Sequence, residues 1–121
     1  MISLDRIRDV SEHIVRQFAP DRIILFGSYA YGTPDEGSDV DLLVVLPFEG
    51  KAYRKSAEIA SAVHAGFPLD VLARRPDDVE RRYRAADPLI REAVNRGQVL
   101  YERHRTPTCP SLLALLPAST E

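Results

Sequence analysis

The sequence predicts a mixed α/β (α+β) domain in which helices pack against a small sheet of three to five strands. Three apolar segments of strand length support this prediction, at residues 22–26, 39–46 and 67–73. Helical patterns alternate with these segments along the chain, an order that favours one sheet covered by helices. A chain of 121 residues is long enough for a single domain. We expect the domain to span residues 1–104, with a tail at 105–121.

The first half of the chain supplies a helix and two strands. Apolar side chains recur at steps of three and four over residues 4–18, which predicts an amphipathic helix. Ser3 can cap its start. The segment RIILF then predicts a strand that ends at Gly27, and a short helical turn and a polar loop follow. Residues 39–46 give the strongest strand signal, since both faces are apolar beyond two aspartates, as in a central strand.

The second half continues with further helices and strands. An Ala-rich helix is expected over residues 51–64, with Tyr53 and Ala57 on the same stripe as Val63. The segment FPLDVLA predicts a third strand. Pro76 and Asp87 each stand at the start of a further helix, and a short extended segment, QVLYE, follows them.

Composition excludes several classes of protein. The formal net charge of −2 gives no reason to expect direct nucleic-acid binding or attraction to an anionic membrane. No apolar run approaches the roughly 18 residues of a membrane span. Cys109 is the single cysteine, which excludes an internal disulfide. We therefore expect a reduced, cytoplasmic protein. The LLALL segment of the tail could pack on the domain or dock on a partner.

Two aspartates open the central strand. Side chains alternate along a strand, so Asp39 and Asp41 point to one face with their Cα atoms about 6.6 Å apart. Carboxylates at this spacing can converge on Mg²⁺, which prefers oxygen ligands, whereas a structural zinc site would use Cys or His. Each aspartate alone could equally be a solvated strand end. Two on one face repel each other unless a cation or hydrogen bonds compensate.

Two other parts of the chain can complete such a site. Asp70 lies inside an apolar strand segment, where a carboxylate is expensive to bury unless it is paired. If strand 67–73 lies beside strand 39–46, Asp70 can join the metal site or accept a proton from an attacking hydroxyl. Otherwise it is a strand-end residue held by backbone N–H groups. Gly27 lets a phosphate approach the backbone closely, and Ser28 offers a hydroxyl and N–H groups to an anion.

The pattern G-S-x10-D-x-D, formed by Gly27-Ser28 and Asp39-Val40-Asp41, resembles the signature of the polymerase beta-like nucleotidyltransferase superfamily. The short chain and the acid at Asp70 are similar to its minimal nucleotidyltransferases (MNT proteins), over about residues 1–103. This resemblance implies a nucleotidyltransferase (polymerase beta-like palm) fold. It also implies that the Gly-Ser pair holds the triphosphate of ATP and that the three aspartates bind two Mg²⁺ ions. Asp70 would also activate an acceptor hydroxyl for attack on the α-phosphate.

The chain departs from the family pattern at Tyr31, where many members carry an arginine. Tyrosine cannot supply a positive charge. Lys51, Arg54 or Lys55 could compensate for the missing arginine. Otherwise these three residues are the solvated start of a helix.

The resemblance also suggests a partner. MNT proteins typically act as antitoxins beside a HEPN-domain ribonuclease toxin, as in type VII toxin–antitoxin systems, and some transfer AMP onto a tyrosine of that toxin. The resemblance implies the same activity here, in a homo-oligomer or a hetero-oligomer with the toxin. Two alternatives stay open. The chain could modify a small molecule, as aminoglycoside nucleotidyltransferases do, or it could be a toxin-binding antitoxin without catalysis.

Overall fold

The computed structural model of the chain describes residues 2–32, 34 and 37–103. The expected tail at 105–121, with Cys109, lies outside these residues, as does part of the polar loop after the second helix. The described elements follow the predicted order: α1 (Leu4–Phe18), β1 (Arg22–Phe26), α2 (Ser28–Tyr31), β2 (Val40–Val45), α3 (Ala52–Val63), β3 (Leu69–Arg74), α4 (Pro76–Arg84), α5 (Pro88–Arg96) and β4 (Gln98–Glu102).

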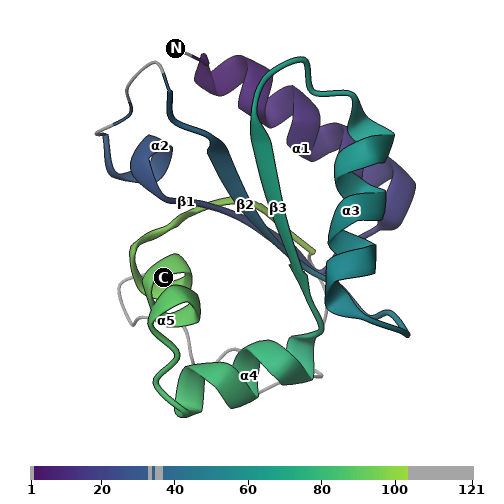
Figure 1. Cartoon of the computed structure of the whole chain (residues 1–121), viewed down its shortest axis with the longest axis vertical. Coiled ribbons are helices and arrows are strands. Elements are labelled where there is room, and N and C mark those ends of the chain that lie inside the picture. Colours follow the sequence, from purple (N-terminus) through teal and green to yellow (C-terminus); the bar gives the residue numbers. More distant parts are fainter. Residues whose placement is uncertain (1, 33, 35–36, 104–121) are drawn as a thin grey trace.

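The four described strands form one mixed sheet in the order β3-β2-β1-β4 (Figure 1). β1 pairs antiparallel with both β2 and β4, whereas β2 and β3 are parallel. α1 and α3 cover one face, and α4 and α5 cover the other (Figure 1). The predicted class, a small mixed sheet with helices packed against it, is therefore confirmed. No helix in the described part of the chain is long and apolar enough to cross a membrane.

The core lies on both sides of the sheet, and β2 contributes to both. Leu42 and Val44 pack with Ile7 and Ile14 of α1 on one face. The alternate residues of β2 face the other side, where Leu43 and its neighbours pack beneath α4 and α5. All of these side chains are almost fully buried, which makes the hydrophobic effect the main force holding the layers together. The prediction that 39–46 is a central strand is thus confirmed.

The start of α1 agrees with the sequence prediction, but the buried face of α3 does not. The Ser3 hydroxyl accepts a hydrogen bond from the Arg6 backbone N–H at 3.3 Å, which caps α1. In α3, the expected stripe is wrong at Tyr53, which is 64% exposed, and at Ala57, which is also exposed. Ile59 and Val63 are the buried residues of this helix. An Ala-rich helix has several small-residue stripes, and packing against the edge of the sheet decides between them.

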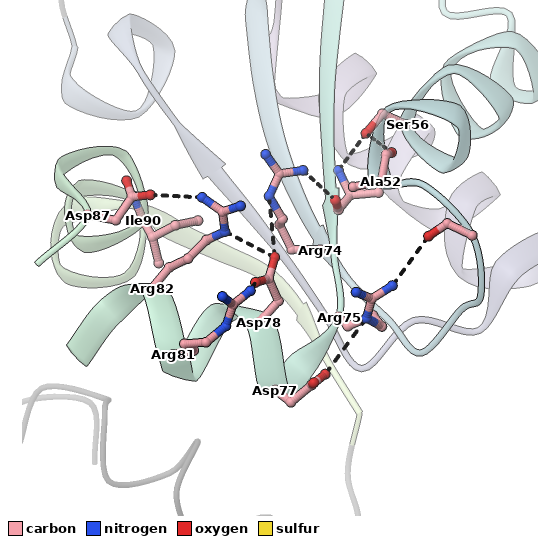
Figure 2. A network of polar contacts seen from close by, with 12 residues as sticks. Ala52, Ser56, Arg74, Arg75, Asp77, Asp78, Arg81, Arg82, Asp87 and Ile90 are labelled. Carbon is pink, nitrogen blue, oxygen red and sulfur yellow. Dashed lines mark hydrogen bonds and ion pairs between the residues drawn. The ribbon is translucent and has the colours of Figure 1, made fainter. Parts of the chain in front are cut away.

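A network of ion pairs joins β3 to α4 and α5 (Figure 2). Asp78 in the first turn of α4 is only 7% exposed and pairs with Arg81 and Arg82. Burial raises the pKa of the Asp78 carboxyl, but hydrogen bonds from the two arginines outweigh burial and lower it overall. Arg82 also reaches Asp87, which caps α5. Arg81 and Arg82 of α4 therefore have a structural role, because they pair with Asp78 and link α4 to the cap of α5.

The hydroxyl of Ser56 ties α3 to the edge strand β3. Its Oγ donates to the Ala52 carbonyl and accepts a hydrogen bond from the Ala73 N–H, both at 2.9 Å (Figure 2). β3 is at the edge of the sheet, so the Ala73 N–H has no strand beyond it to pair with. The side chain of Ser56 takes that place.

We expect Ser56→Ala to lower the free energy of unfolding by about 1 to 2 kcal/mol, because the Ala73 N–H loses its partner in a partly buried position. Urea denaturation followed by circular dichroism measures this difference. Ser61→Ala is the matched control, since Ser61 is an exposed residue of the same helix. Equal effects of the two substitutions would contradict the role of Ser56 at the edge.

Candidate functional site

The sheet register brings the predicted aspartates together at one end. Asp41 pairs with Asp70 across the parallel strands β2 and β3, and with Phe26 across β1. β3 therefore lies beside β2, which is the condition that the sequence analysis set for Asp70 to join the site. Paired residues of adjacent strands project to the same face, and Asp39 shares that face because it lies two residues before Asp41. Asp41 also has the same parity as Leu43, so the carboxylates lie on the side of the sheet that α4 and α5 cover.

The three carboxylates interact electrostatically. Burial, followed by the charges of Asp70 and then Asp39, raises the pKa of Asp41 from its ordinary value of 3.8 to about 6. Asp39 and Asp70 are exposed, whereas Asp41 is partly buried. The site thus concentrates negative charge, and no arginine or lysine is among the causes that shift the pKa of Asp41.

Gly27 lies directly against the Asp41 carboxylate. Its φ of 78° falls in the left-handed region, which favours glycine. A Cβ atom at this position would overlap Oδ2 of Asp41 and lie 3.1 Å from its Cγ. The Gly27 carbonyl accepts hydrogen bonds from the N–H groups of Ala30 and Tyr31, at 3.0 and 3.2 Å, and so begins α2 at Ser28. The predicted phosphate loop and the predicted metal carboxylate are therefore in contact.

The donor set fits a hard divalent cation. It consists of carboxylate oxygens alone, the ligands that Mg²⁺ prefers. Within the described residues, no three His, Cys, Asp or Glu side chains are already grouped closely enough to hold a metal ion. The repulsion of Asp41 by Asp70 and Asp39 helps to raise the pKa of Asp41, and a bound cation would relieve this repulsion.

Two cavities lie elsewhere on the molecule. One, of about 360 Å³, is lined by α1 together with Leu100 and Tyr101 of β4. The other, of about 240 Å³, lies between α1 and the segment around His64 and Phe67. Neither is lined by Asp39 or Asp41, or by their partner on β3. The candidate site is therefore identified by charge and by sheet register.

Two of the three cations proposed to compensate for Tyr31 make contacts within their own helix. Lys55 forms an ion pair with Glu58 at 2.9 Å, and the Arg54 guanidinium lies 5.9 Å from the ring of Tyr53. These contacts fit the alternative interpretation, in which the start of α3 is a charged helix surface. Instead, the guanidinium of Arg96 lies 4.3 Å from the centre of the Tyr31 ring. The sequence analysis missed Arg96, because no motif links the end of one helix to a residue so far away in the chain.

Comparison with known proteins agrees with this geometry. The sequence profile of the family described as nucleotidyltransferase domain matches residues 7–100, which include β1, β2 and β3. The chain belongs to this family. Its membership confirms the resemblance stated above at the level of the nucleotidyltransferase domain.

Individual relatives match less of the chain. A protein of Methanocaldococcus jannaschii named as a candidate protein adenylyltransferase is 42% identical over 52 residues, which are 43% of this chain. The match spans about half (52%) of that curated relative. A toxin–antitoxin solved with AMP-PNP is 21% identical, with a TM-score of 0.54, covering 89% of this chain and 79% of the other. A double aspartate-to-glutamate mutant of the toxin–antitoxin MntA–HpeT is 18% identical, with a TM-score of 0.53, covering 94% and 84%. These two structures share the fold.

Gly27→Ala and Gly32→Ala form a matched pair, because both glycines have φ near 80°. Each substitution is expected to lower the free energy of unfolding by about 1 kcal/mol through backbone strain. A Cβ on Gly32 meets nothing within 4 Å, whereas one on Gly27 displaces the Asp41 carboxylate. We therefore expect Gly27→Ala alone to weaken Mg²⁺–ATP binding, by about 10- to 100-fold, as measured by titration calorimetry. Similar affinities for the two variants would contradict the contact.

The raised pKa of Asp41 makes a prediction about stability. Its folded-state pKa lies above the ordinary value, so the stability it contributes is present below pH 3.8 and is lost as pH rises through about 6. Allowing for solvent screening, we expect Asp41→Asn to raise the free energy of unfolding of the metal-free protein by about 1 to 2 kcal/mol above pH 6.

Urea denaturation in EDTA at a series of pH values from 4 to 8 measures this difference over most of the interval between the two pKa values and above it. Asp9→Asn serves as control, since Asp9 is an exposed acid on α1. An Asp41→Asn variant that is no more stable than the wild type at pH 8 would show that Asp41 is not strained by its neighbours.

Proposed function

We propose that this protein transfers AMP from ATP to a hydroxyl acceptor, with Mg²⁺, and that the acceptor is a tyrosine of a HEPN-domain toxin. The observation that carries the proposal is the alignment of Asp41 with Asp70 beside Gly27, since it combines a carboxylate cluster with a close backbone approach. Membership of the nucleotidyltransferase domain family supports the class of reaction.

In this proposal the glycine–serine pair binds phosphate and the three aspartates hold metal. Gly27 and Ser28 bind the triphosphate, because Gly27 lies directly against the Asp41 carboxylate and the phosphates would then lie beside the metal that this carboxylate holds. Asp39, Asp41 and Asp70 hold the Mg²⁺ ions. Bound Mg²⁺ supplies charge neutralisation at the phosphates and orients them for in-line displacement.

The transfer itself requires a proton acceptor near the incoming hydroxyl. The acceptor oxygen forms a bond to the α-phosphorus, the bond from that phosphorus to the oxygen bridging to the β-phosphorus breaks, and pyrophosphate leaves. Asp70 accepts the proton of the hydroxyl. Its exposed position on the edge strand β3 suits this task, because a macromolecular acceptor can reach it from solvent.

The toxin partner is supported by two solved neighbours, which are toxin–antitoxin assemblies, one of them with AMP-PNP. The curated relative is named as a protein adenylyltransferase candidate. A tyrosine hydroxyl on a folded partner can reach the exposed side chain of Asp70 from solvent.

The test uses the full chain, a HEPN protein encoded beside it, Mg²⁺ and ATP labelled on either the α- or the γ-phosphate. We expect label on the HEPN protein from α-labelled ATP only, because AMP transfer releases the γ-phosphate within pyrophosphate. Asp41→Asn and Asp70→Asn are expected to reduce the rate about 100-fold or more, since each removes a charge needed in the transition state. Asp9→Asn should leave the rate unchanged.

Other results would select other functions. Label on neither protein, together with full toxin neutralisation by Asp39→Asn/Asp41→Asn, would replace the proposal with a non-catalytic antitoxin. Transfer from α-labelled ATP to an aminoglycoside but not to the HEPN protein would replace it with small-molecule modification. A tyrosine-to-phenylalanine change at the labelled site of the toxin should abolish labelling, and persistence of the label would refute tyrosine as the acceptor.

A further inference from the structure

Tyr31 has an unusual environment for a residue beside a phosphate loop. Its hydroxyl is buried, and within the described residues it has no hydrogen-bond partner of acceptable geometry. Burial, followed by the Glu92 carboxylate, raises the pKa of Tyr31 to about 12, while the Gly27 backbone and Arg96 act in the opposite direction. The Tyr31 side chain thus lies among Gly27, Glu92 and Arg96. The hydroxyl therefore stays neutral, and the part of the side chain that contacts Arg96 is the aromatic ring.

Arg96 is held at this ring by the way α5 ends. Its guanidinium lies 4.3 Å from the ring centre, within the range of a favourable cation–π contact. The next residue, Gly97, packs so closely on β1 that a Cβ would lie 2.8 Å from the Leu25 carbonyl oxygen. One residue further, the side-chain amide (Nε2) of Gln98 donates a hydrogen bond to the Ala30 carbonyl at 3.2 Å. The end of α5 is therefore fixed against both β1 and α2.

This position brings Arg96 to the same end of the sheet as the aspartates. β4 begins at Gln98, which pairs with Leu25, the neighbour of Phe26. Phe26 pairs in turn with Asp41. Two strand spacings, about 10 Å, separate the start of β4 from Asp41. Both the Asp41 carboxylate and α5 lie on the same face of the sheet, and the backbone turn at Gly27 lies between them.

We propose that Arg96 binds the polyphosphate of the nucleotide, and that the Tyr31 ring is the platform that positions its guanidinium beside Gly27. The inference rests on the proposed function and adds a binding residue to it. A guanidinium stacked on a ring keeps the N–H groups of its edge free, and these match phosphate oxygens in a bidentate geometry. Tyr31 is then a positioning residue, and the positive charge comes from α5 instead of α2.

A purely structural role for Arg96 makes different predictions. A basic residue in the last turn of a helix is stabilising, and Arg96 also lies one turn after Glu92. In that case its removal would lower the stability of the protein and affect all ligands alike. In a polyphosphate-binding role, its removal affects only ligands that carry the polyphosphate.

The experiment measures binding by titration calorimetry with three probes, in the presence of Mg²⁺: α,β-methylene ATP, inorganic tripolyphosphate and AMP. We expect Arg96→Ala to weaken binding of the first two about 10- to 100-fold, as for the loss of a charged hydrogen-bond pair, and to leave AMP binding unchanged. Tyr31→Leu should weaken the same two probes, and Tyr31→Phe should not, because phenylalanine keeps the ring.

Arg91→Ala is the matched control. Arg91 lies on the same helix and its guanidinium stacks on another ring, 4.8 Å from the centre of Tyr83, on the α4 side. It should leave all three affinities unchanged. The double variant Tyr31→Arg/Arg96→Ala should recover most of the affinity for tripolyphosphate, because it moves the charge to α2 close to the same place.

Each result decides between the interpretations. Wild-type affinity in Arg96→Ala, or an equal loss for AMP and tripolyphosphate, would overturn the role of Arg96 while leaving the proposed nucleotidyl transfer in place. A wild-type protein that binds none of the three probes would overturn the proposed function itself. Loss of binding in Tyr31→Phe equal to that in Tyr31→Leu would show that the hydroxyl, not the ring, matters, and would remove Tyr31 as the platform.

Discussion

The parallel pairing of β2 with β3 is the contact on which the site depends. It places Asp41 opposite Asp70, so two carboxylates meet across adjacent strands. Burial and the neighbouring charge of Asp70 both raise the pKa of Asp41, so a charged carboxylate is unfavourable in this position. The apolar remainder of β2 is buried on both faces and provides the stabilisation that offsets this repulsion. The arrangement of charges is thus maintained by the core rather than by contacts within the site.

Local patterns were sufficient to predict the elements and to single out most residues of the candidate site. The helical period of α1, the apolar run of β2 and the spacing between Gly27 and Asp41 are all properties of short segments. The position of Asp70 beside Asp41 depends on which strands pair. Because the sequence does not determine that pairing, it predicted this position only on the condition that the two strands are neighbours. The buried face of α3 was predicted wrongly at Tyr53, because small residues leave several faces of that helix equally suitable for packing.

The contact between Arg96 and Tyr31 could not be predicted at all. It depends on where α5 ends over the sheet, and that position is set by the close packing of Gly97 on β1. The sequence showed only that Tyr31 lacks the positive charge of the family's arginine. In the structure, the guanidinium of Arg96 stacks on its ring. A motif describes which side chain occupies a position, whereas a binding site needs only a suitable group at a point in space, from whichever element can reach it.

The uneven burial of the three carboxylates divides the site into a rigid and an adaptable part. Asp41 belongs to the central strand and lies against the Gly27 backbone, so its freedom to reorient is small. Asp39 precedes that strand and Asp70 stands on the edge strand, and both are exposed. In the proposed metal site, a cation would therefore meet one preorganised ligand and two that must still lose rotamer freedom. The entropic part of such a metal affinity would accordingly be set at the rim of the site, away from the core that fixes its location.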